Sequence, residues 1–351
     1  MSKSGFFTSG PCAAILSAAL FGLSPVLCKG LIGGMSPALL AGLLYLGSGI
    51  GLSLLIAIQR PGLLRELALL SPLHRRKLCL AVLAGGVIAP LCLTYGIKYG
   101  SAAEVTLLLN LETVATTLLA WLIFKEHVSR QVWIGKILII VAAALVLLRP
   151  DGELTFSRSG VLVLLACLFW GIDNNLTRDV EELPATVLAA VKGFGAGIFT
   201  IVLALLFTPG SATPGQIGGA LLIGALSYGA SLVLFVGALR RIGSARTSTF
   251  FAVGPFIGTL AAVLILGEEL PPASLVAATL MLAGVACLYG EQHGHLHSHL
   301  ATAHGHRHEH DEHHQHQHAA DSEEIFDHAH EHEPLTHLHA HWPDIHHRHT
   351  H

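Results

Sequence analysis

The feature that most constrains this chain is a succession of long apolar stretches between residues 11 and 290. A helix that crosses a lipid bilayer needs about 20 consecutive apolar residues. A search with that length predicts ten membrane spans, at residues 11–32, 36–58, 78–97, 102–123, 133–149, 159–177, 184–207, 217–239, 245–266 and 273–290. The first span is too long for the core of a signal peptide, so we expect it to be retained. We therefore predict an all-α, polytopic membrane protein.

The composition divides the chain into a membrane part and a polar tail. Of the 351 residues, 52% are hydrophobic and only 12% are charged, whereas about a quarter of the residues in a soluble domain are charged. Residues 291–351 contain almost no Leu, Ile or Val, but they hold all except two of the 24 histidines. We expect three parts, with boundaries at 1–150, 151–290 and 291–351. No basic patch with interleaved aromatic residues is present, so we expect no nucleic-acid partner.

Lysine and arginine residues in the loops predict the orientation of the spans, because cytoplasmic loops are enriched in them. With the N-terminus inside, the inner loops carry Arg60, Arg65, Arg75, Arg76, Lys77, Lys125, Arg130, Arg178, Arg240, Arg241 and Arg246. The outer loops carry little more than Lys98, Arg149 and Arg158. Ten spans then place both termini in the cytoplasm. We expect an integral protein of a bacterial cytoplasmic (inner) membrane, with the lipid bilayer as its surroundings.

The membrane part contains an internal repeat. Aligned without gaps, residues 102–126 and 244–268 are identical at Ala103/Ala245, Thr117/Thr259, Leu118/Leu260, Ala120/Ala262, Leu122/Leu264, Ile123/Ile265 and Glu126/Glu268. A weaker similarity relates ALFG at 19–22 to CLFWG at 167–171. Two units of five spans each must have opposite orientations, since an odd number of crossings inverts the chain. Inverted repeats are common in secondary transporters, whose substrate site lies near mid-membrane where the repeats meet.

Two segments of each half carry a resemblance to a known family. They are LLLNLETVATTLLAWLIFKE with WIGKILIIVAAALVLL, and VGPFIGTLAAVLILGEE with LVAATLMLAGVACLYG. Over residues 11–290 the chain is similar to the EamA domains of the drug/metabolite transporter superfamily. The resemblance implies ten helices and export or exchange of small solutes without ATP. The family pattern has a proline where this chain has Thr113, while Pro255 keeps it in the second half. The pattern therefore gives no support for a kink in the fourth span. The tail resembles the endings of one histidine-rich subset of the family.

Ionisable residues within the spans are candidates for function, because each costs a few kcal/mol at mid-bilayer and usually faces a cavity or a partner. We predict a substrate cavity lined by Glu112, Lys192, Asp173, Asn174, Asn175 and Trp170. For Glu112, binding of a proton or a cation competes with a structural hydrogen bond or ion pair, for example with Lys192. Lys192 itself is more simply a charge that compensates a carboxylate. For Asp173 we favour capping of an inner helix end over a role at the site or gate, and for the two asparagines both of these explanations stay open. For Trp170 we favour an interfacial or packed aromatic residue over a gate or cavity wall.

Other charged residues of the spans and loops are expected to be structural. Lys29 and Lys136 lie within spans, and their long side chains are expected to extend to the membrane interface. Glu126 and Glu268 follow equivalent spans of the two halves and are expected to cap or brace loops at opposite faces. His127 is expected to be an exposed loop residue.

The tail has the composition of a multivalent metal-binding segment. Neutral imidazole is a ligand for Zn, Ni, Co and Cu ions, and alternate residues of an extended segment share one face. The candidate ligands are His304, His306, His308, His310, His313, His314, His316, His318, His328, His330, His332, His337, His339, His341, His346, His347, His349 and His351. Little apolar surface is present to offset the entropy of ordering, so we expect disorder without metal. A pH sensor that titrates at about pH 6.5 and a tail without function are the alternatives.

Together these features favour a secondary-active transporter, more specifically an exporter of a small solute that works by alternating access. The tail would either collect a transported metal ion or sense metal while the cargo is organic, and both versions stay open. The alternative is a membrane-anchored metal buffer, or a metal or pH sensor, without transport. No HExxH, nucleophile elbow, P-loop or dinucleotide fingerprint is present, so we expect no enzyme. We expect no required cofactor, only divalent transition metal at the tail, and a homodimer stays open.

Overall fold

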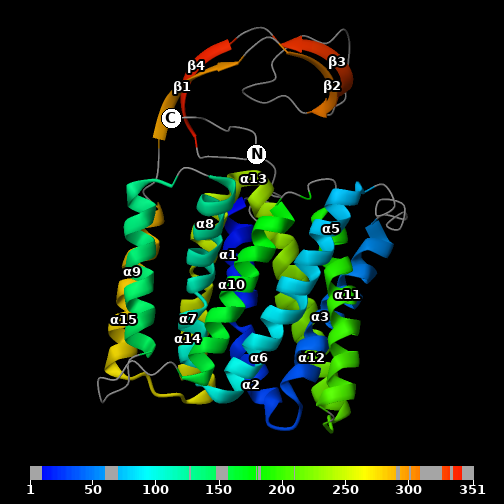
Figure 1. Ribbon diagram of the computed structural model, residues 1–351, viewed down its shortest axis with the longest axis vertical. Coiled ribbons are helices and arrows are strands. Elements are labelled where there is room, and N and C mark those ends of the chain that lie inside the picture. The colour runs from blue at the N-terminus through cyan, green and yellow to red at the C-terminus, as the bar shows by residue number, and fades with distance from the viewer. Residues whose placement is uncertain are drawn as a thin grey trace, which may run out of the picture. The chain divides into compact units, whose positions relative to one another are not determined.

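The structure is a computed structural model (Figure 1). It describes residues 10–59, 70–125, 128–147, 157–178, 180, 183–208, 210–289, 293–299, 302–308, 326–332 and 335–341. The chain divides into two compact units, one of Met1–Glu291 with Asp344–His351 and the other of Gln292–Pro343. In the described residues the first unit is helical and the second consists of strands, and each is considered by itself.

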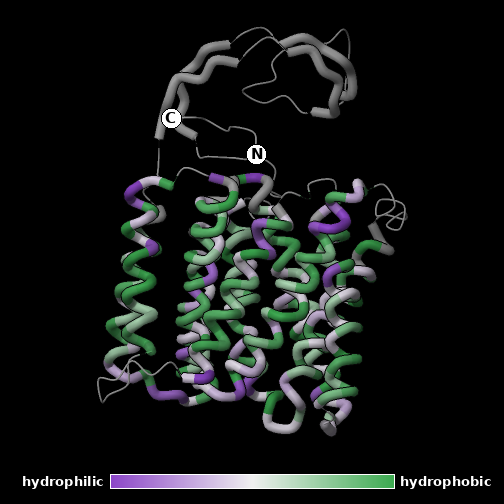
Figure 2. The backbone as a smooth tube through the Cα atoms, in the orientation of Figure 1, coloured by the Kyte–Doolittle hydropathy of each residue, from purple (hydrophilic) through white to green (hydrophobic). Residues whose placement is uncertain are grey.

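The membrane unit is a bundle of helices. The first half contains α1 (Gly10–Gly22), α2 (Ser24–Ile32), α3 (Pro37–Gln59), α5 (Pro72–Ala81), the π-helix η1 (Val82–Ile88), α6 (Ala89–Tyr99), α7 (Ala102–Leu108), α8 (Leu111–Phe124) and α9 (Arg130–Leu147). The second half contains α10 (Arg158–Arg178), α11 (Ala185–Phe207), α12 (Pro214–Ile223), the π-helix η2 (Gly224–Ala230), α13 (Ser231–Phe251), α14 (Gly254–Leu266) and α15 (Pro272–Tyr289). Figure 2 shows hydrophobic residues along the length of these helices, with hydrophilic residues gathered mainly near their ends.

The ten predicted spans coincide with helices. Within the described residues, eight helical stretches are long and apolar enough to cross a membrane, and two shorter apolar helices lie at Gly254–Leu266 and Pro272–Cys287. The prediction of an all-α, multi-span membrane part is thereby confirmed. The predicted loop between the eighth and ninth spans is wrong, because residues 240–244 lie within the continuous helix α13. This segment contains no proline and only one glycine, so local propensity does not end the helix there.

The helix boundaries confirm the internal repeat. Helices α3 and α11 both have 23 residues and begin 148 residues apart. Helices α9 and α15 both have 18 residues and begin 142 residues apart. The same interval separates the two π-helices, the left-handed C-cap residues Lys125 and Gly267, and the residue pairs that align in the sequence. The two halves therefore share the order of these elements, except that α13 is continuous where α6 and α7 are separate helices. Five predicted spans in each half give the halves opposite orientations.

Each half also has a break in its fourth span, where α7 gives way to α8 and α13 gives way to α14. In the second half Pro255 removes a backbone donor at this place. In the first half Thr113 stands at the equivalent position, and its hydroxyl donates a hydrogen bond to the Asn110 carbonyl (2.9 Å). The break is thus present even without the proline. It places Glu112 in the first turn of α8.

The two halves make their most extensive contact between α3 and α11. A Cβ atom on Gly193 would lie 2.4 Å from the backbone nitrogen of Gly49, and one on Gly197 would lie 2.5 Å from that of Leu46. Small residues at such a crossing let membrane helices approach closely. Because Lys192 directly precedes Gly193, this crossing also positions the single lysine of α11.

The described part of the tail unit consists of β1 (His293–His299), β2 (Thr302–His308), β3 (Phe326–His332) and β4 (Leu335–His341). Strand β1 pairs antiparallel with β4, and β2 pairs antiparallel with β3. The register sets histidine opposite histidine at His293/His341, His295/His339, His297/His337, His304/His330 and His306/His328. Isolated two-stranded ribbons are only marginally stable in water, which agrees with the disorder that the composition predicts for the metal-free tail.

Candidate functional site

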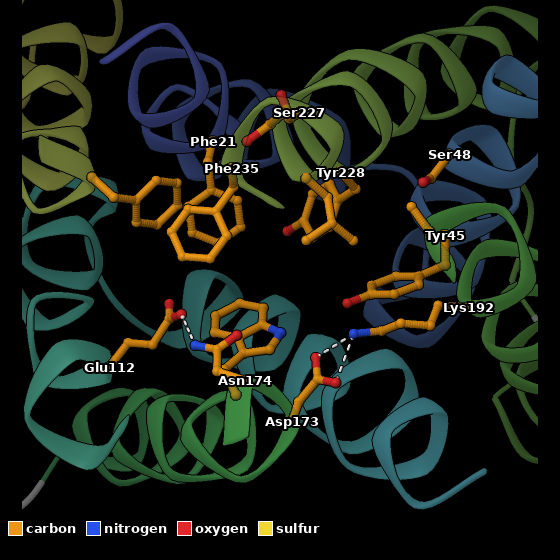
Figure 3. A pocket seen from close by; sticks show the side chains of 15 residues that line it. Phe21, Tyr45, Ser48, Glu112, Asp173, Asn174, Lys192, Ser227, Tyr228 and Phe235 are labelled. Carbon is orange, nitrogen blue, oxygen red and sulfur yellow. Dashed lines mark hydrogen bonds and ion pairs between the residues drawn. The ribbon is translucent and has the colours of Figure 1, made fainter. Parts of the chain in front are cut away.

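A cavity between the two halves gathers most of the predicted site residues (Figure 3). Five of the six candidates line it: Glu112, Trp170, Asp173, Asn174 and Lys192. The sixth, Asn175, is not part of the lining. Its amide instead donates to the carbonyls of Gly171 (2.8 Å) and Thr116 (3.1 Å), and so it braces α10 against α8. The lining also includes residues that the sequence did not single out, among them Phe21, Tyr45, Tyr228, Phe235 and Phe251.

Lys192 and Asp173 form a buried ion pair in the cavity wall. The Lys192 Nζ atom lies 2.6 Å from Oδ1 and 2.5 Å from Oδ2 of Asp173, and only 4% and 5% of the two side chains are exposed. The Thr177 hydroxyl donates a further hydrogen bond to Oδ1 (3.0 Å). The pairing of Lys192 with Glu112 is not formed, and the expectation that Asp173 caps a helix end is wrong. Asp173 lies inside α10 and forms an ion pair with Lys192 instead.

The π-helix η1 explains why Asp173 reaches that lysine. Both α10 and α11 pack against η1. A Cβ atom on Gly85, within η1, would lie 2.0 Å from Oδ2 of Asp173, so only glycine leaves room for the carboxylate. A π-helix bonds each carbonyl to the N–H five residues later. Five residues after Gly85 stands Pro90, which has no N–H. The Gly85 carbonyl accepts hydrogen bonds from the Tyr45 hydroxyl (2.5 Å) and from Trp170 Nε1 (3.0 Å) instead.

Glu112 enters the cavity from the break in the fourth span. Its Oε1 atom accepts a hydrogen bond from Asn174 Nδ2 (2.9 Å), which also contacts Thr116 Oγ1 (3.2 Å). A carboxylate in the first turn of a helix is favoured by the unpaired N–H groups and the helix dipole. Within the part of the chain that the structure describes, Glu112 has no ion-pair partner. It is therefore the uncompensated carboxylate of the cavity.

Aromatic rings form much of the remaining wall. The ring centroid of Phe21 lies 5.5 Å from Trp170, 5.7 Å from Tyr228 and 5.5 Å from Phe251. Phe235 lies 4.8 Å from Phe251 in an edge-to-face contact. Figure 3 shows Phe21, Phe235 and Tyr228 on the side of the cavity away from the charged groups. The charged groups thus lie along one wall, which they share with Tyr45, while Phe21, Phe235 and Tyr228 lie opposite.

Of the aromatic residues that the sequence did not single out, Phe21 could have been found from the internal repeat, whereas Tyr45 and Tyr228 could not. Phe21 belongs to ALFG, the counterpart of the CLFWG segment that carries Trp170, so the repeat pairs the two segments. Tyr45 and Tyr228 stand in apolar stretches, where an aromatic residue usually serves packing. Tyr228 is 6% exposed, and its hydroxyl has no hydrogen-bond partner among the described residues.

The face opposite the basic loops is held together by two side-chain caps. Both carboxylate oxygens of Glu268 accept hydrogen bonds from the first two backbone N–H groups of α7 (2.9 and 2.8 Å). The Lys29 ammonium donates to the carbonyls of Ile97 (2.8 Å) and Gly100 (2.5 Å) at the end of α6. The expectation that Glu268 braces this face is confirmed. Lys29 satisfies helix carbonyls and is not simply extended to the interface.

The remaining predicted residues have different outcomes. Lys136 is only 3% exposed, so the expectation that it reaches the interface is wrong. Helix α9 packs along α15, which covers this side. Glu126 and His127 lie outside the described residues.

The tail candidates divide into two sets. Strands contain His304, His306, His308, His328, His330, His332, His337, His339 and His341. Outside the described residues lie His310, His313, His314, His316, His318, His346, His347, His349 and His351. Among the described residues, no three His, Cys, Asp or Glu side chains are grouped to hold a metal ion.

Comparison with known proteins agrees with this architecture. The sequence pattern of the EamA-like transporter family matches residues 8–148 and 158–290, which make up most of the chain. An uncharacterized transporter of Methanothermobacter thermautotrophicus (strain Delta H) is 27% identical over 296 residues, covering 80% of this chain and 86% of that protein. The uncharacterized transporter YyaM of Bacillus subtilis (strain 168) is 24% identical over 207 residues, covering 56% and 67%. A solved structure described only as "Crystal structure of protein" shares the fold, with a TM-score of 0.62, 16% identity, and coverage of 78% of this chain and 94% of that one.

Proposed function

Because the chain belongs to the EamA-like transporter family, we propose that it is a secondary-active exporter of a small organic solute with the central cavity as its transit site. One observation carries the proposal: the two inverted halves jointly build the cavity. Phe21, Tyr45 and Glu112 come from the first half, while Asp173 and Lys192 come from the second. A site shared by inverted halves changes its access when one half moves against the other.

Alternating access is supported by the different construction of the two faces. Glu268 and Lys29 close the helix ends at the face opposite the basic loops. The charged pair of the cavity lies nearer the other face, since Asp173 is close to the end of α10 and Lys192 follows the start of α11. We take the basic face as cytoplasmic, with both termini there. The cavity would then load from the cytoplasm, and release of the solute would require the Glu268 cap to open.

An organic cargo fits the cavity better than a metal ion. Transition metals in proteins are held by several His, Cys or carboxylate ligands. Among the described residues that line the cavity there is no histidine or cysteine, and one of the two carboxylates is already paired with Lys192. We assign divalent transition metals to the tail, as regulators. The register that sets histidine opposite histidine supports this assignment.

The test is transport by purified full-length protein in proteoliposomes. Radiolabelled amines, amino acids, and Zn, Ni and Co ions would be offered separately in both membrane orientations. We expect protein-dependent flux of an organic solute that Glu112→Gln removes and Glu104→Gln, a carboxylate variant in α7 outside the cavity, leaves intact. Flux of metal ions instead of organic solutes would overturn the choice of cargo. No flux of any kind, with metal still bound by the tail, would favour a buffer or sensor.

A further inference from the structure

Among the described lining residues, the nitrogen donors and the Tyr45 hydroxyl already make hydrogen bonds, while the hydroxyls of Ser48 and Ser227 can still donate or accept. The Lys192 ammonium is held by both oxygens of Asp173. The N–H of Trp170 and the hydroxyl of Tyr45 are both directed to the Gly85 carbonyl. The amide nitrogen of Asn174 donates to Glu112 and Thr116. A ligand carboxylate or phosphate would need such donors, and it would have to displace contacts that are already made.

Acceptors, by contrast, remain available. Glu112 uses one carboxylate oxygen for Asn174, and a carboxylate can accept several more hydrogen bonds. The hydroxyl of Tyr228 is more than nine-tenths buried, and its electrostatic neighbours include the buried Ser24 hydroxyl, which lies outside the cavity lining. A hydroxyl can donate as well as accept, so this group is compatible with a ligand of either kind. The preference for a donor ligand therefore rests on Glu112.

The charges lead to the same chemistry. Asp173 and Lys192 cancel each other, so an ionised Glu112 gives the described lining one net negative charge. A second cation is the natural partner for that charge, because a carboxylate in a cavity of low polarity is stabilised by an opposite charge. The described lining of the same cavity contains six aromatic side chains: Phe21, Tyr45, Trp170, Tyr228, Phe235 and Phe251. Such rings attract a cation electrostatically and also bind an apolar body.

From the unpaired acceptors, the net charge and the aromatic wall we infer that the cargo is an organic cation, a protonated amine attached to an aromatic or similarly apolar body. The inference rests on the proposed function, because it names the class of solute for the same cavity. The ammonium group donates to Glu112, and the apolar body packs among the rings around Phe21. The space among the lining atoms is about 580 Å³, including the part open to solvent. In this conformation it limits the cargo to a small molecule.

The test uses three indoles that differ only at the end of the side chain. Tryptamine carries an ammonium group, 3-propylindole is neutral, and indole-3-propionate is an anion. Equilibrium dialysis would measure binding of radiolabelled tryptamine to the full-length protein in detergent at neutral pH, with the other two as competitors. We expect tryptamine to bind about tenfold more tightly than either competitor, the difference that a hydrogen bond to a charged group typically makes. Equal binding of the three, or tighter binding of the anion, would overturn the inference.

Variants locate the binding. Glu112→Gln is expected to weaken the binding of tryptamine about tenfold while leaving the binding of 3-propylindole unchanged. Glu112→Asp keeps the charge and is expected to retain binding, so it remains informative if the glutamine variant does not fold. Glu104→Gln is the matched control and is expected to bind as the unaltered protein does. Unchanged tryptamine affinity in Glu112→Gln would overturn the inference.

The same material separates this inference from the proposed function. Protein-dependent flux of neutral or anionic solutes without tryptamine binding would contradict the inferred class of cargo and would leave the proposed transport function intact. Tryptamine binding that depends on Glu112, without flux of any solute, would support the inferred class of ligand and contradict the proposed transport function.

Discussion

A Cβ atom on Gly85 would lie 2.0 Å from a carboxylate oxygen of Asp173, so any residue larger than glycine in this π-helix position would collide with the buried acid. In Gly85→Ala the carboxylate must move, and its contact with Lys192 is lost or weakened. We expect a loss of stability on the order of 3 kcal/mol, as for other broken buried ion pairs. Thermal unfolding in detergent measures it. Gly195→Ala is the control, since its nearest neighbour, Val82 Cγ1, would be 3.4 Å away. Equal stability of the two variants would contradict the account.

The Asp173–Lys192 pair should show strong coupling in a double-mutant cycle. Asp173→Asn or Lys192→Met alone leaves a buried charge without its partner, and each is expected to destabilise the protein by about 3–5 kcal/mol. The double variant removes both charges and should lose much less than the sum of the two single changes. Unfolding midpoints of the four proteins measure the coupling. Additive losses would show that the pair contributes nothing as a pair.

The Gly85 carbonyl depends on two side-chain donors, because Pro90 cannot supply the backbone donor. Tyr45→Phe or Trp170→Phe leaves one donor in place, and each lost hydrogen bond should cost about 1 kcal/mol. The double variant leaves a buried carbonyl with neither donor, so its loss should exceed the sum. Tyr95→Phe, whose ring stacks on Tyr99, serves as a control for hydroxyl removal. A double variant no worse than the sum would mean that another donor reaches this carbonyl.

The cap that Glu268 makes on α7 should be visible in hydrogen exchange. Glu268→Ala removes the acceptor for two backbone N–H groups at the start of the helix, and loss of a helix cap costs about 1 kcal/mol. We expect faster exchange of the first-turn amides of α7. The adjacent variant Glu269→Ala changes an exposed side chain and should leave that exchange unchanged. The same rate in both variants would argue against the cap.

Metal binding by the tail should depend on pH and on the tail itself. Imidazole must be neutral to coordinate a metal ion, and its ordinary pKa is about 6.5. Zinc binding by the full-length protein is therefore expected at pH 7.5 and should fall as the pH drops through that value. A chain ending at Tyr289 should lose the binding and keep its thermal stability, because the tail forms a unit of its own. Calorimetry on the two proteins measures this. Zinc bound equally by both would place the site elsewhere.

Much of the architecture could be predicted because it depends on local composition. A run of about 20 apolar residues has few stable structures in lipid other than a helix, so the ten spans were recognisable one at a time. The repeat was visible because equivalent positions, such as Ala103 and Ala245, keep the same 142-residue interval as the helix boundaries. Ionisable groups are also unfavourable in free energy within lipid, so Glu112, Asp173 and Lys192 could be recognised as unusual.

The contacts of those residues could not be predicted in the same way. Glu112 and Asp173 are both acids within spans, and nothing along the chain says which one meets Lys192. That choice is made by η1, which packs against both α10 and α11 and offers a glycine where the carboxylate passes. Lys136 is a similar case, because its burial comes from the neighbouring α15 and not from its own span.

The sequence by itself determined that this chain is a duplicated membrane protein with a histidine-rich tail, since hydrophobicity and repetition are properties of consecutive residues. Only the tertiary structure decided which acid is neutralised, which is left facing the cavity, and which aromatic rings surround it. The physical reason is that hydrogen bonds and ion pairs act over a few ångströms. Their partners are therefore chosen by helix packing between residues that are far apart in the chain.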